Sequence, residues 1–333
     1  MLHPGRGPGR RTSFSAGTLY RVSSEHERIN RIRTLFSRPN PAISLGIGDD
    51  CAVLAPAPGE RVWTIDTAIE HVHFSRAFMR DDQIGFRALM AATSDIAAMG
   101  AEASAALCAL AFPASFDDRA LDALLAGIAE AADQLALPVV GGNLSRAGEL
   151  SITITVLGQT EHAITRAGAA PDQGIFVSGG VGGAGLGLAA LRAGRGHEAA
   201  FAPAIERFLR PRARLDLSAS LRRHASAALD ISDGLVQDLG HLCTASGLGA
   251  ELELARVPRL ADFAALAESL GKDPVALLLG GGEDYELLFT APVAGVPPAL
   301  GTCIGFTRTS GGVRVLSESG APLPLPAGFD HFR

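Results

Sequence analysis

Strand-like and helix-like segments alternate through this chain, and this alternation narrows its possible folds more than any other feature. From about residue 25 to the end, short apolar runs are followed by longer segments with apolar residues at helical spacing. This order predicts an α/β or α+β fold. A polar stretch at 160–173, containing glycine and proline, interrupts the order, which then starts again. We therefore predict a tail and two α/β domains of similar size, over residues 1–20, 21–160 and 161–333.

Apolar spacing and turn residues place the expected elements. In the first domain we expect strands at 43–47, 62–65, 106–112 and 151–158, and helices at 83–99 and 118–135. In the second domain we expect strands at 174–178, 225–229, 250–254, 285–290 and 303–306, and a helix at 184–192. Asp117 is placed to cap the helix that follows it. Ile152, Ile154 and Val156 are predicted to share one face of their strand.

Composition and charge exclude several classes of protein. The chain has 333 residues and a formal net charge of -6, which gives no basic surface for a nucleic-acid backbone. Its 4 cysteines lie far apart without a CxxC motif, which argues against a disulfide framework or a zinc site. The longest apolar stretch, 96–113, contains Gly100 and Glu102, so we expect a helix end and a buried strand there instead of a membrane span. We expect a cytoplasmic protein.

Acidic residues beside glycines, at the expected ends of strands, are the main chemical signal. In GIGDDCAVL, Asp49 and Asp50 are adjacent, and two carboxylates this close repel each other unless a cation lies between them. Asp66 ends one apolar strand, and Asp230 ends another in ALDISDGL. Plainer explanations exist, because an exposed turn accounts for the first pair and an Asp at a strand end often caps the next turn.

Two further segments place polar groups beside glycines, next to an expected strand or helix. Ser232 and Asp233 stand at the expected start of a helix, and either of them could be its N-cap. A cap explains one of the polar positions in this segment but not all of them. In GGGEDYEL, Glu283 and Asp284 follow three glycines, which predicts a flexible acidic loop before a buried strand.

Among the acids, Asp95 gives the strongest physical indication of a binding site. It shares one face of the helix expected at 83–99 with Ile84, Ala88, Ala91 and Ala98. An unpaired carboxylate on an apolar face is costly. A structural salt bridge is one explanation, but the other faces of the helix offer few basic partners. We therefore favour a role for Asp95 in binding a metal or a phosphate group.

The segment VVGGNLSR supplies an amide in a similar setting. Gly141 and Gly142 allow a close approach to the backbone, and Asn143 follows them at the expected end of a strand. Together with the acids, this residue predicts a shared site for a divalent cation. Hard oxygen ligands favour Mg²⁺, which commonly combines a few carboxylates with waters and phosphate oxygens. No HExxH motif or cysteine cluster indicates zinc.

A glycine pattern at 180–185 resembles the dinucleotide-binding fingerprint in outline. Gly180, Gly182 and Gly185 have the GxGxxG spacing between an expected strand and an expected helix. The segment is so rich in glycine that chance meets this spacing easily, and the acid expected at the end of a second strand is missing. We therefore predict a tight strand-to-helix turn without a dinucleotide.

Taken together, these motifs resemble those of the thiamine-monophosphate kinases, within a larger family of ATP-dependent enzymes that includes aminoimidazole ribonucleotide synthetase. The matching segments, in family order between Leu45 and Phe332, are GIGDDCAVL, the strand ending at Asp66, SDIAAMGA, GGNLSR, TRAGAAP, DISDGLVQDLGH, GGGEDYEL and GFDHF. The resemblance implies an α/β (α+β) protein with an N-terminal nucleotide-binding domain of the aminoimidazole ribonucleotide synthetase type. This domain would pair with its twin into a homodimer, and a C-terminal α/β domain would close over the substrate.

The resemblance also implies a reaction and a set of site residues. The reaction is the ATP-dependent phosphorylation of thiamine monophosphate to thiamine diphosphate, assisted by several Mg²⁺ ions. The implied metal ligands are Asp50, Thr64, Ile65 (through its backbone), Asp66, Asp95, Asn143, Asp230 and Asp233. The implied ATP contacts are Gly142, Asn143, Arg166 and Ser232, and the implied substrate contacts are His73, Glu283 and Phe329. Asp50 and Asp230 would be the catalytic pair among them.

The chain departs from the family pattern at three of these positions. Asn143 stands where the family commonly has Asp, and an amide oxygen binds Mg²⁺ without contributing negative charge. We therefore expect one metal to be held more weakly or through water. Ile65 replaces a residue that is often a hydroxyl, so its carbonyl alone would serve. Phe329 replaces a Tyr-like residue and keeps only the stacking surface.

The implied mechanism is in-line transfer of the γ-phosphoryl group to the acceptor phosphate. This phosphate has a second pKa of about 6 and is largely deprotonated near neutral pH, so no strong general base is required. The obstacle is the meeting of two polyanions, which bound Mg²⁺ would relieve. Two alternatives stay open: another enzyme of the same superfamily with a different substrate, and a non-catalytic nucleotide-binding regulator, for which Asn143 is the support in the sequence.

Overall fold

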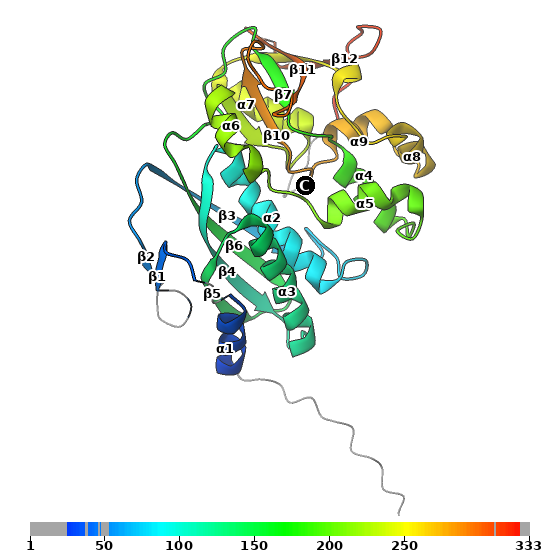
Figure 1. Cartoon of the computed structure of the whole chain (residues 1–333). Coiled ribbons are helices and arrows are strands. Elements are labelled where there is room, and N and C mark those ends of the chain that lie inside the picture. Colours follow the sequence, from blue (N-terminus) through cyan, green and yellow to red (C-terminus); the bar gives the residue numbers. More distant parts are fainter. Residues whose placement is uncertain (1–24, 37–38, 46, 48–52, 310, 327–333) are drawn as a thin grey trace, which may run out of the picture.

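The computed structural model describes residues 25–36, 39–45, 47, 53–309 and 311–326. Its N-terminal half contains a four-stranded sheet in the order β3-β6-β4-β5. The strands are β3 (Glu60–Ile69), β4 (Glu102–Phe112), β5 (Val139–Arg146) and β6 (Ser151–Thr160). The other elements of this half are α1 (Glu25–Phe36), β1 (Ile43–Leu45), β2 (Val53–Leu54), α2 (Asp81–Ala98) and α3 (Asp118–Leu135). Helices α2 and α3 cover one face of the sheet (Figure 1).

Alternation along β6 explains why only one face of this sheet is covered. Ile152, Ile154 and Val156 are all buried on the side of α2, as their spacing predicts. The opposite face carries Trp63 and Ile65 of β3, which are 66% and 68% exposed. The N-terminal sheet therefore has one face packed against helices and one open apolar face.

Two glycines let α2 and α3 pack closely on each other. A Cβ atom at Gly85 of α2 would lie 2.1 Å from the carbonyl oxygen of Leu124, and one at Gly127 of α3 would lie 1.8 Å from that of Asp82. The two backbones therefore touch at these positions, which fixes how α2 crosses α3. Asp117 caps α3 as expected, because its carboxylate accepts a hydrogen bond from the Ala120 N–H at 2.9 Å.

The C-terminal half contains a six-stranded sheet in the order β12-β9-β11-β7-β10-β8, in which only the β12–β9 pair is parallel. Its strands are β7 (Gly174–Val177), β8 (Ala227–Asp230), β9 (Gly249–Glu253), β10 (Leu287–Ala291), β11 (Thr302–Arg308) and β12 (Val313–Leu316). Its α-helices are α4 (Gly183–Arg192), α5 (Ala202–Leu209), α6 (Ser218–His224), α7 (Leu235–Ser246), α8 (Phe263–Ser269) and α9 (Pro274–Gly280). Short 3-10 turns lie at Ala199–Phe201, Leu215–Leu217 and Leu254–Arg256.

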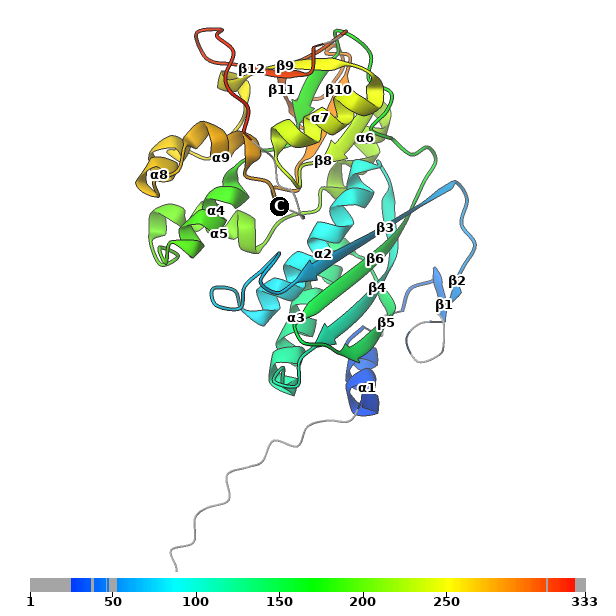
Figure 2. The same ribbon diagram turned by 180° about the vertical axis from the view of Figure 1, so that it is seen from behind.

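Helix α2 belongs to the N-terminal half by sequence but also packs against the C-terminal sheet. Ala97 and Ala98, at its end, share an apolar cluster with Phe176 and Phe289 of the second sheet. Figures 1 and 2 show α2 between the two sheets when the molecule is seen from either side. A side chain on α2 can therefore contact either half of the chain.

The expected mixed α/β class is confirmed, and most expected strands lie within a few residues of their predicted bounds. Two expectations are corrected. Asn143 lies inside β5 and not at a strand end, because β5 continues to Arg146 beside β4. The short helices α6, α8 and α9 were not predicted, since each has fewer than ten residues and shows too little periodicity. Among the residues that the structure describes, no helix is long and apolar enough to cross a bilayer.

Candidate functional site

Three aspartates from three different elements approach one another where α2 meets both halves of the chain. Asp66 lies on β3, Asp95 in the last turns of α2, and Asp230 at the end of β8. The Thr64 hydroxyl donates a hydrogen bond to Asp95 Oδ2 at 2.5 Å. Thr64 and Asp66 are two residues apart on β3, so both side chains point to the α2 side of the sheet. The fold therefore brings acids that are far apart along the chain to one junction.

The pKa values of this cluster record how close the charges are. Burial, together with the charge of Asp95, raises the pKa of Asp230 to about 7. Burial also raises the pKa of Asp95, with a contribution from the charge of Asp66, while the Thr64 hydroxyl opposes the shift. Arg166 is exposed, but its charge lowers the pKa of both Asp95 and Asp230. The group thus runs from the buried Asp230 through the half-buried Asp95 to the exposed Asp66, with a cationic side chain at its edge.

The donor set fits a hard divalent cation better than a salt bridge. Within the described part of the chain, neither Asp95 nor Asp230 has an Arg or Lys ion pair. In the same part, no three His, Cys, Asp or Glu side chains converge closely enough to enclose a metal ion by themselves. Mg²⁺ usually takes one or two carboxylates and completes its shell with waters and phosphate oxygens. The pair of Asp95 and Asp230, with Asp66 beside it, is such a partial ligand set.

The turn that follows Asp230 is held by an acid that the sequence analysis missed. Asp238 Oδ2 accepts hydrogen bonds from the backbone N–H groups of Ser232, Asp233 and Gly234, each at 3.1 Å. The expectation that Ser232 or Asp233 caps α7 is therefore wrong: the N-cap is Gly234, and it makes no side-chain cap bond. Asp238 satisfies these donors from the first turn of the helix, and so fixes the backbone that carries Ser232 and Asp233.

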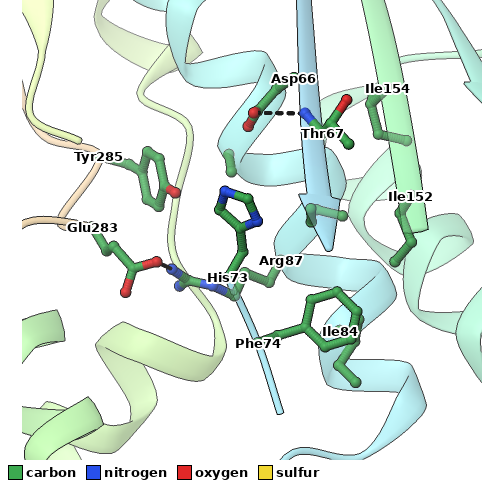
Figure 3. A pocket seen from close by; sticks show the side chains of 13 residues that line it. Asp66, Thr67, His73, Phe74, Ile84, Arg87, Ile152, Ile154, Glu283 and Tyr285 are labelled. Carbon is green, nitrogen blue, oxygen red and sulfur yellow. Dashed lines mark hydrogen bonds and ion pairs between the residues drawn. The ribbon is translucent and has the colours of Figure 1, made fainter. Parts of the chain in front are cut away.

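A small pocket lies beside the aspartate cluster, between β3, α2 and the loop before β10 (Figure 3). Its polar lining includes Asp66, His73, Arg87, Glu283 and Tyr285. The cavity volume is about 50 Å³, whereas small-molecule pockets usually hold about 300–1,000 Å³. The pocket must therefore widen before a ligand of that size enters. It places the two described substrate-contact candidates, His73 and Glu283, on one cavity that reaches Asp66.

His73 is fixed by a local contact. Its Nδ1 atom accepts a hydrogen bond from the Ile69 N–H at 3.1 Å. The neutral ring then carries its proton on Nε2, which makes Nε2 a donor. The surroundings of His73 thus combine this donor with the carboxylates of Asp66 and Glu283.

The acidic loop before β10 is firmly held and not flexible as expected. Glu283 Oε1 lies 2.6 Å from Arg87 Nη2 on α2. Asp284 Oδ2 and Oδ1 accept hydrogen bonds from the N–H groups of Gly182 at 2.6 Å and Ala184 at 3.0 Å. The N-terminus of α4 is therefore occupied by a carboxylate from the chain itself. This explains why the GxGxxG spacing there marks a tight turn, as predicted, and leaves these two N–H groups satisfied without a dinucleotide.

Burial raises the pKa of Asp284 to about 7, from its ordinary value of 3.8. Between these two pH values the folded chain binds more protons than the unfolded chain, so the free energy of unfolding decreases as the pH rises. We expect Asp284→Asn to remove this contribution. The variant should gain stability relative to the unmodified chain between pH 5 and pH 8, as measured by urea unfolding at both values. A stability difference that is the same at the two pH values would contradict the assignment.

Two of the implied nucleotide residues lie on the other side of the N-terminal sheet. The strand registers align Asn143 of β5 with Ala109 and Thr153, on the open face that also exposes Ile65. Three strand spacings separate β5 from β3, which is about 14 Å. Only glycine fits at position 142, because β4 lies so close that a Cβ atom there would be 1.8 Å from the Cys108 carbonyl oxygen. The structure therefore does not bring Gly142 and Asn143 to the aspartate cluster of the same chain.

The remaining implied residues divide into two groups. Ser232 and Asp233 are half-buried in the turn after Asp230, next to the cluster. Asp50 and Phe329 lie outside the residues that the structure describes. Sequence reasoning also missed Arg87 and Tyr285. A lone arginine in the apolar run IGFRALM was the available signal for Arg87.

Comparison with known proteins places the whole chain in one group. The family model "AIR synthase related protein, N-terminal domain" matches residues 48–160, and the corresponding C-terminal domain model matches 170–293. The thiamine-monophosphate kinase of Aquifex aeolicus is 34% identical over 288 residues, which cover 86% of this chain and 92% of that protein.

Solved structures agree with this grouping. The structure of AaThiL complexed with AMPPCP and TMP has a TM-score of 0.76 at 33% identity, and covers 95% of this chain and 99% of that one. The thiamine-monophosphate kinase of Stenotrophomonas maltophilia has a TM-score of 0.78 at 35% identity, with 88% and 96% of the two chains covered. These likenesses extend over both halves of the fold.

Proposed function

This chain belongs to the thiamine-monophosphate kinase family of AIR synthase related proteins, and from that premise we propose that it transfers the γ-phosphoryl group of ATP to thiamine monophosphate. The observation that carries the proposal is the position of the aspartate cluster. Asp230 is buried beside the half-buried Asp95, and Asp66 connects this pair to the pocket that contains Glu283 and His73. The aspartates proposed to act on the phosphoryl donor are thus adjacent to the pocket proposed to hold the acceptor.

The chemistry at this junction is governed by charge. Mg²⁺ bound there would neutralise the two polyanionic substrates and align the attack. Asp95 and Asp230 would hold the cation, Asp66 would stand between the cation and the acceptor, and Arg166 would add positive charge at the exposed edge. The acceptor phosphate is already largely ionised at neutral pH, so the residues have to position it and not to deprotonate it.

The pocket residues suit the organic part of the acceptor. Glu283 and Asp66 offer carboxylates to a cationic or hydrogen-bonding heterocycle, and Tyr285 offers an aromatic surface. Burial holds the pKa of the Tyr285 hydroxyl far above its ordinary value, so this phenol stays protonated. The proposed acceptor therefore meets a site that combines anionic and aromatic groups.

The test is to incubate the purified chain with ATP, MgCl₂ and thiamine monophosphate, and to measure thiamine diphosphate by chromatography. We expect the product to appear and to disappear when MgCl₂ is replaced by EDTA. Tight ATP binding without product would overturn the proposed acceptor and favour a different superfamily reaction or a regulatory role. In that case Asn143→Asp is the next variant to assay, since it restores the charge found in the family pattern.

We also propose that the open face of the N-terminal sheet forms a homodimer interface. This face lines a groove of about 1000 Å³ together with residues of α1. Trp63, Ile65 and Leu107 lie on it with 66%, 68% and 39% of their surfaces exposed. A contiguous apolar face of this kind on a soluble chain usually marks an interface. A second copy would cover it and would also meet Gly142 and Asn143.

Trp63→Glu should convert this dimer into a monomer, because it replaces a large exposed apolar side chain on this face by a charge. The molar mass is measured by size-exclusion chromatography with light scattering. Val293→Glu is the matched control, since Val293 is 50% exposed in the other half of the chain and should leave the mass unchanged. A monomeric unmodified chain, or a dimer that survives Trp63→Glu, would contradict the proposed interface.

A further inference from the structure

Arg87 is a buried cation that connects α2 to the C-terminal half of the chain. Only 6% of the residue is exposed. Its Nη2 atom lies 2.6 Å from Glu283 Oε1, and its Nη1 atom donates a hydrogen bond to the Phe208 carbonyl oxygen. The guanidinium carbon lies 4.3 Å from the ring centre of Phe208 and 5.6 Å from that of Tyr285. The guanidinium group is therefore surrounded by protein groups, as Figure 3 shows on the Glu283 side.

The segment that Arg87 holds has an unfavourable backbone conformation. Glu283 and Tyr285 have φ angles of 60° and 52°, in the left-handed region that residues with a Cβ atom seldom adopt. Such a conformation is unfavourable for a residue with a Cβ atom and persists only where the surroundings impose it. The Glu283 N–H donates to the Ser232 carbonyl at 2.7 Å, and the Tyr285 N–H donates to the Ile231 carbonyl at 2.9 Å. The strained segment is thus fastened to the turn that follows Asp230.

The buried charge of Arg87 is in turn stabilised by Glu283. Burial opposes the charged guanidinium, whereas the charges of Glu283 and Asp66 favour it, and the pKa of Arg87 stays raised. A buried arginine without its anion would be strongly destabilised. The Nη2–Oε1 contact lacks hydrogen-bond geometry, and the Glu283 side chain is 25% exposed. Glu283 therefore keeps lone pairs for a second partner in the pocket.

Helix α2 sets the distance between this ion pair and the aspartate cluster. Arg87 and Asp95 are eight residues apart on the same helix, which corresponds to a rise of about 12 Å. The close packing of α2 on α3 through Gly85 fixes the helix two residues before Arg87. One rigid element thus carries a ligand of the proposed cation at one point and the partner of Glu283 at another.

We propose that Arg87 is a positioning residue that holds Glu283, and with it the acceptor side of the pocket, at a set distance from Asp95 and Asp230. The proposal rests on the proposed function, in which Glu283 contacts the acceptor. In this proposal Arg87 lines the pocket but acts on the acceptor through Glu283, because its guanidinium group already contacts Glu283, Phe208 and Tyr285.

The kinetic test compares Arg87→Met, Glu283→Gln and the double variant. We expect Arg87→Met to raise the KM for thiamine monophosphate about tenfold or more, equivalent to about 1.4 kcal/mol, while the KM for ATP stays within about twofold. Arg87→Lys should recover part of the loss, since it keeps the charge without the planar group. Adding Arg87→Met to Glu283→Gln should cause no further rise. If the increase in KM of the double variant equals the product of the two single increases, Arg87 contacts the acceptor directly and the proposal is overturned.

The matched control is Arg222→Met. Arg222 also joins the two halves, because its guanidinium donates to the Gly100 carbonyl and contacts the Thr160 hydroxyl, but it does not line the pocket. It should lower the melting temperature without changing the ratio of the two KM values. If Arg87→Met behaves in the same way, Arg87 has a structural role only and the proposal fails.

Hydrogen exchange separates this proposal from the proposed function. In the unliganded chain, Arg87→Met should speed exchange at the backbone N–H groups of Glu283 and Tyr285, whereas Arg222→Met should not. This result does not depend on turnover. If the unmodified chain fails to phosphorylate thiamine monophosphate, the proposed function is lost, yet exchange still shows whether Arg87 holds the loop. Unchanged exchange at both amides would refute the positioning role.

Discussion

Replacing Asp230 with Asn is expected to abolish phosphoryl transfer, with a fall in kcat on the order of 10³-fold. The substitution keeps the shape of the side chain and removes the charge that would hold a cation beside Asp95. Transition-state charge on the transferring group would then lose its compensation. Turnover is measured as thiamine diphosphate formed per minute at saturating ATP and MgCl₂. Activity within tenfold of the unmodified chain would remove Asp230 from the proposed site.

The same substitution should not weaken the fold. Burial and the charge of Asp95 raise the pKa of Asp230 to about 7. Without a cation, the folded chain therefore loses stability as the pH rises from the ordinary pKa of 3.8 to about 7, and this loss is complete at pH 8. Asp230→Asn should leave the melting temperature at pH 8 unchanged or higher. Asp262→Asn is a matched control in an exposed residue of left-handed conformation, which Asn adopts as readily, and it should change neither activity nor stability.

Replacing Asp238 with Ala is expected to affect both stability and catalysis. The change leaves the N–H groups of Ser232, Asp233 and Gly234 without their acceptor. An orphaned buried donor costs about 1–3 kcal/mol, and partial hydration of this half-exposed turn limits the total loss to roughly 3 kcal/mol. The displaced turn should also reduce kcat by about 10²-fold, because Asp233 lies on it and Asp230 directly precedes it.

Asp238→Asn distinguishes the hydrogen-bonding role of this residue from its charge. The amide oxygen can still accept the three bonds, and burial already raises the pKa of Asp238 to about 7, so a neutral side chain is tolerated there. We expect this variant to retain most of the stability and most of the activity. Urea unfolding and turnover are measured for both variants. An Asp238→Ala chain that loses stability but keeps its kcat would show that the site does not depend on the turn.

The sequence by itself determined the features that depend on local periodicity and composition. Alternating apolar residues identified β6, Asp117 identified the start of α3, and steps of three and four residues placed Asp95 on an apolar helix face. Each signal is complete within one or two turns or strand repeats, so tertiary contacts were not needed to interpret it. The motif set, in its order along the chain, was also sufficient to indicate the family.

The tertiary structure alone decided which of these groups meet. Arg87 and Glu283 are 196 positions apart and become partners only because α2 packs against both halves of the chain. Asp284 reaches the N-terminus of α4, and Asn143 lies across the sheet from Asp66, for reasons of strand order that no local pattern encodes. Side-chain periodicity fixes the face on which a residue lies, but the opposing surface depends on how distant segments pack, and packing sums many weak contacts over the whole chain.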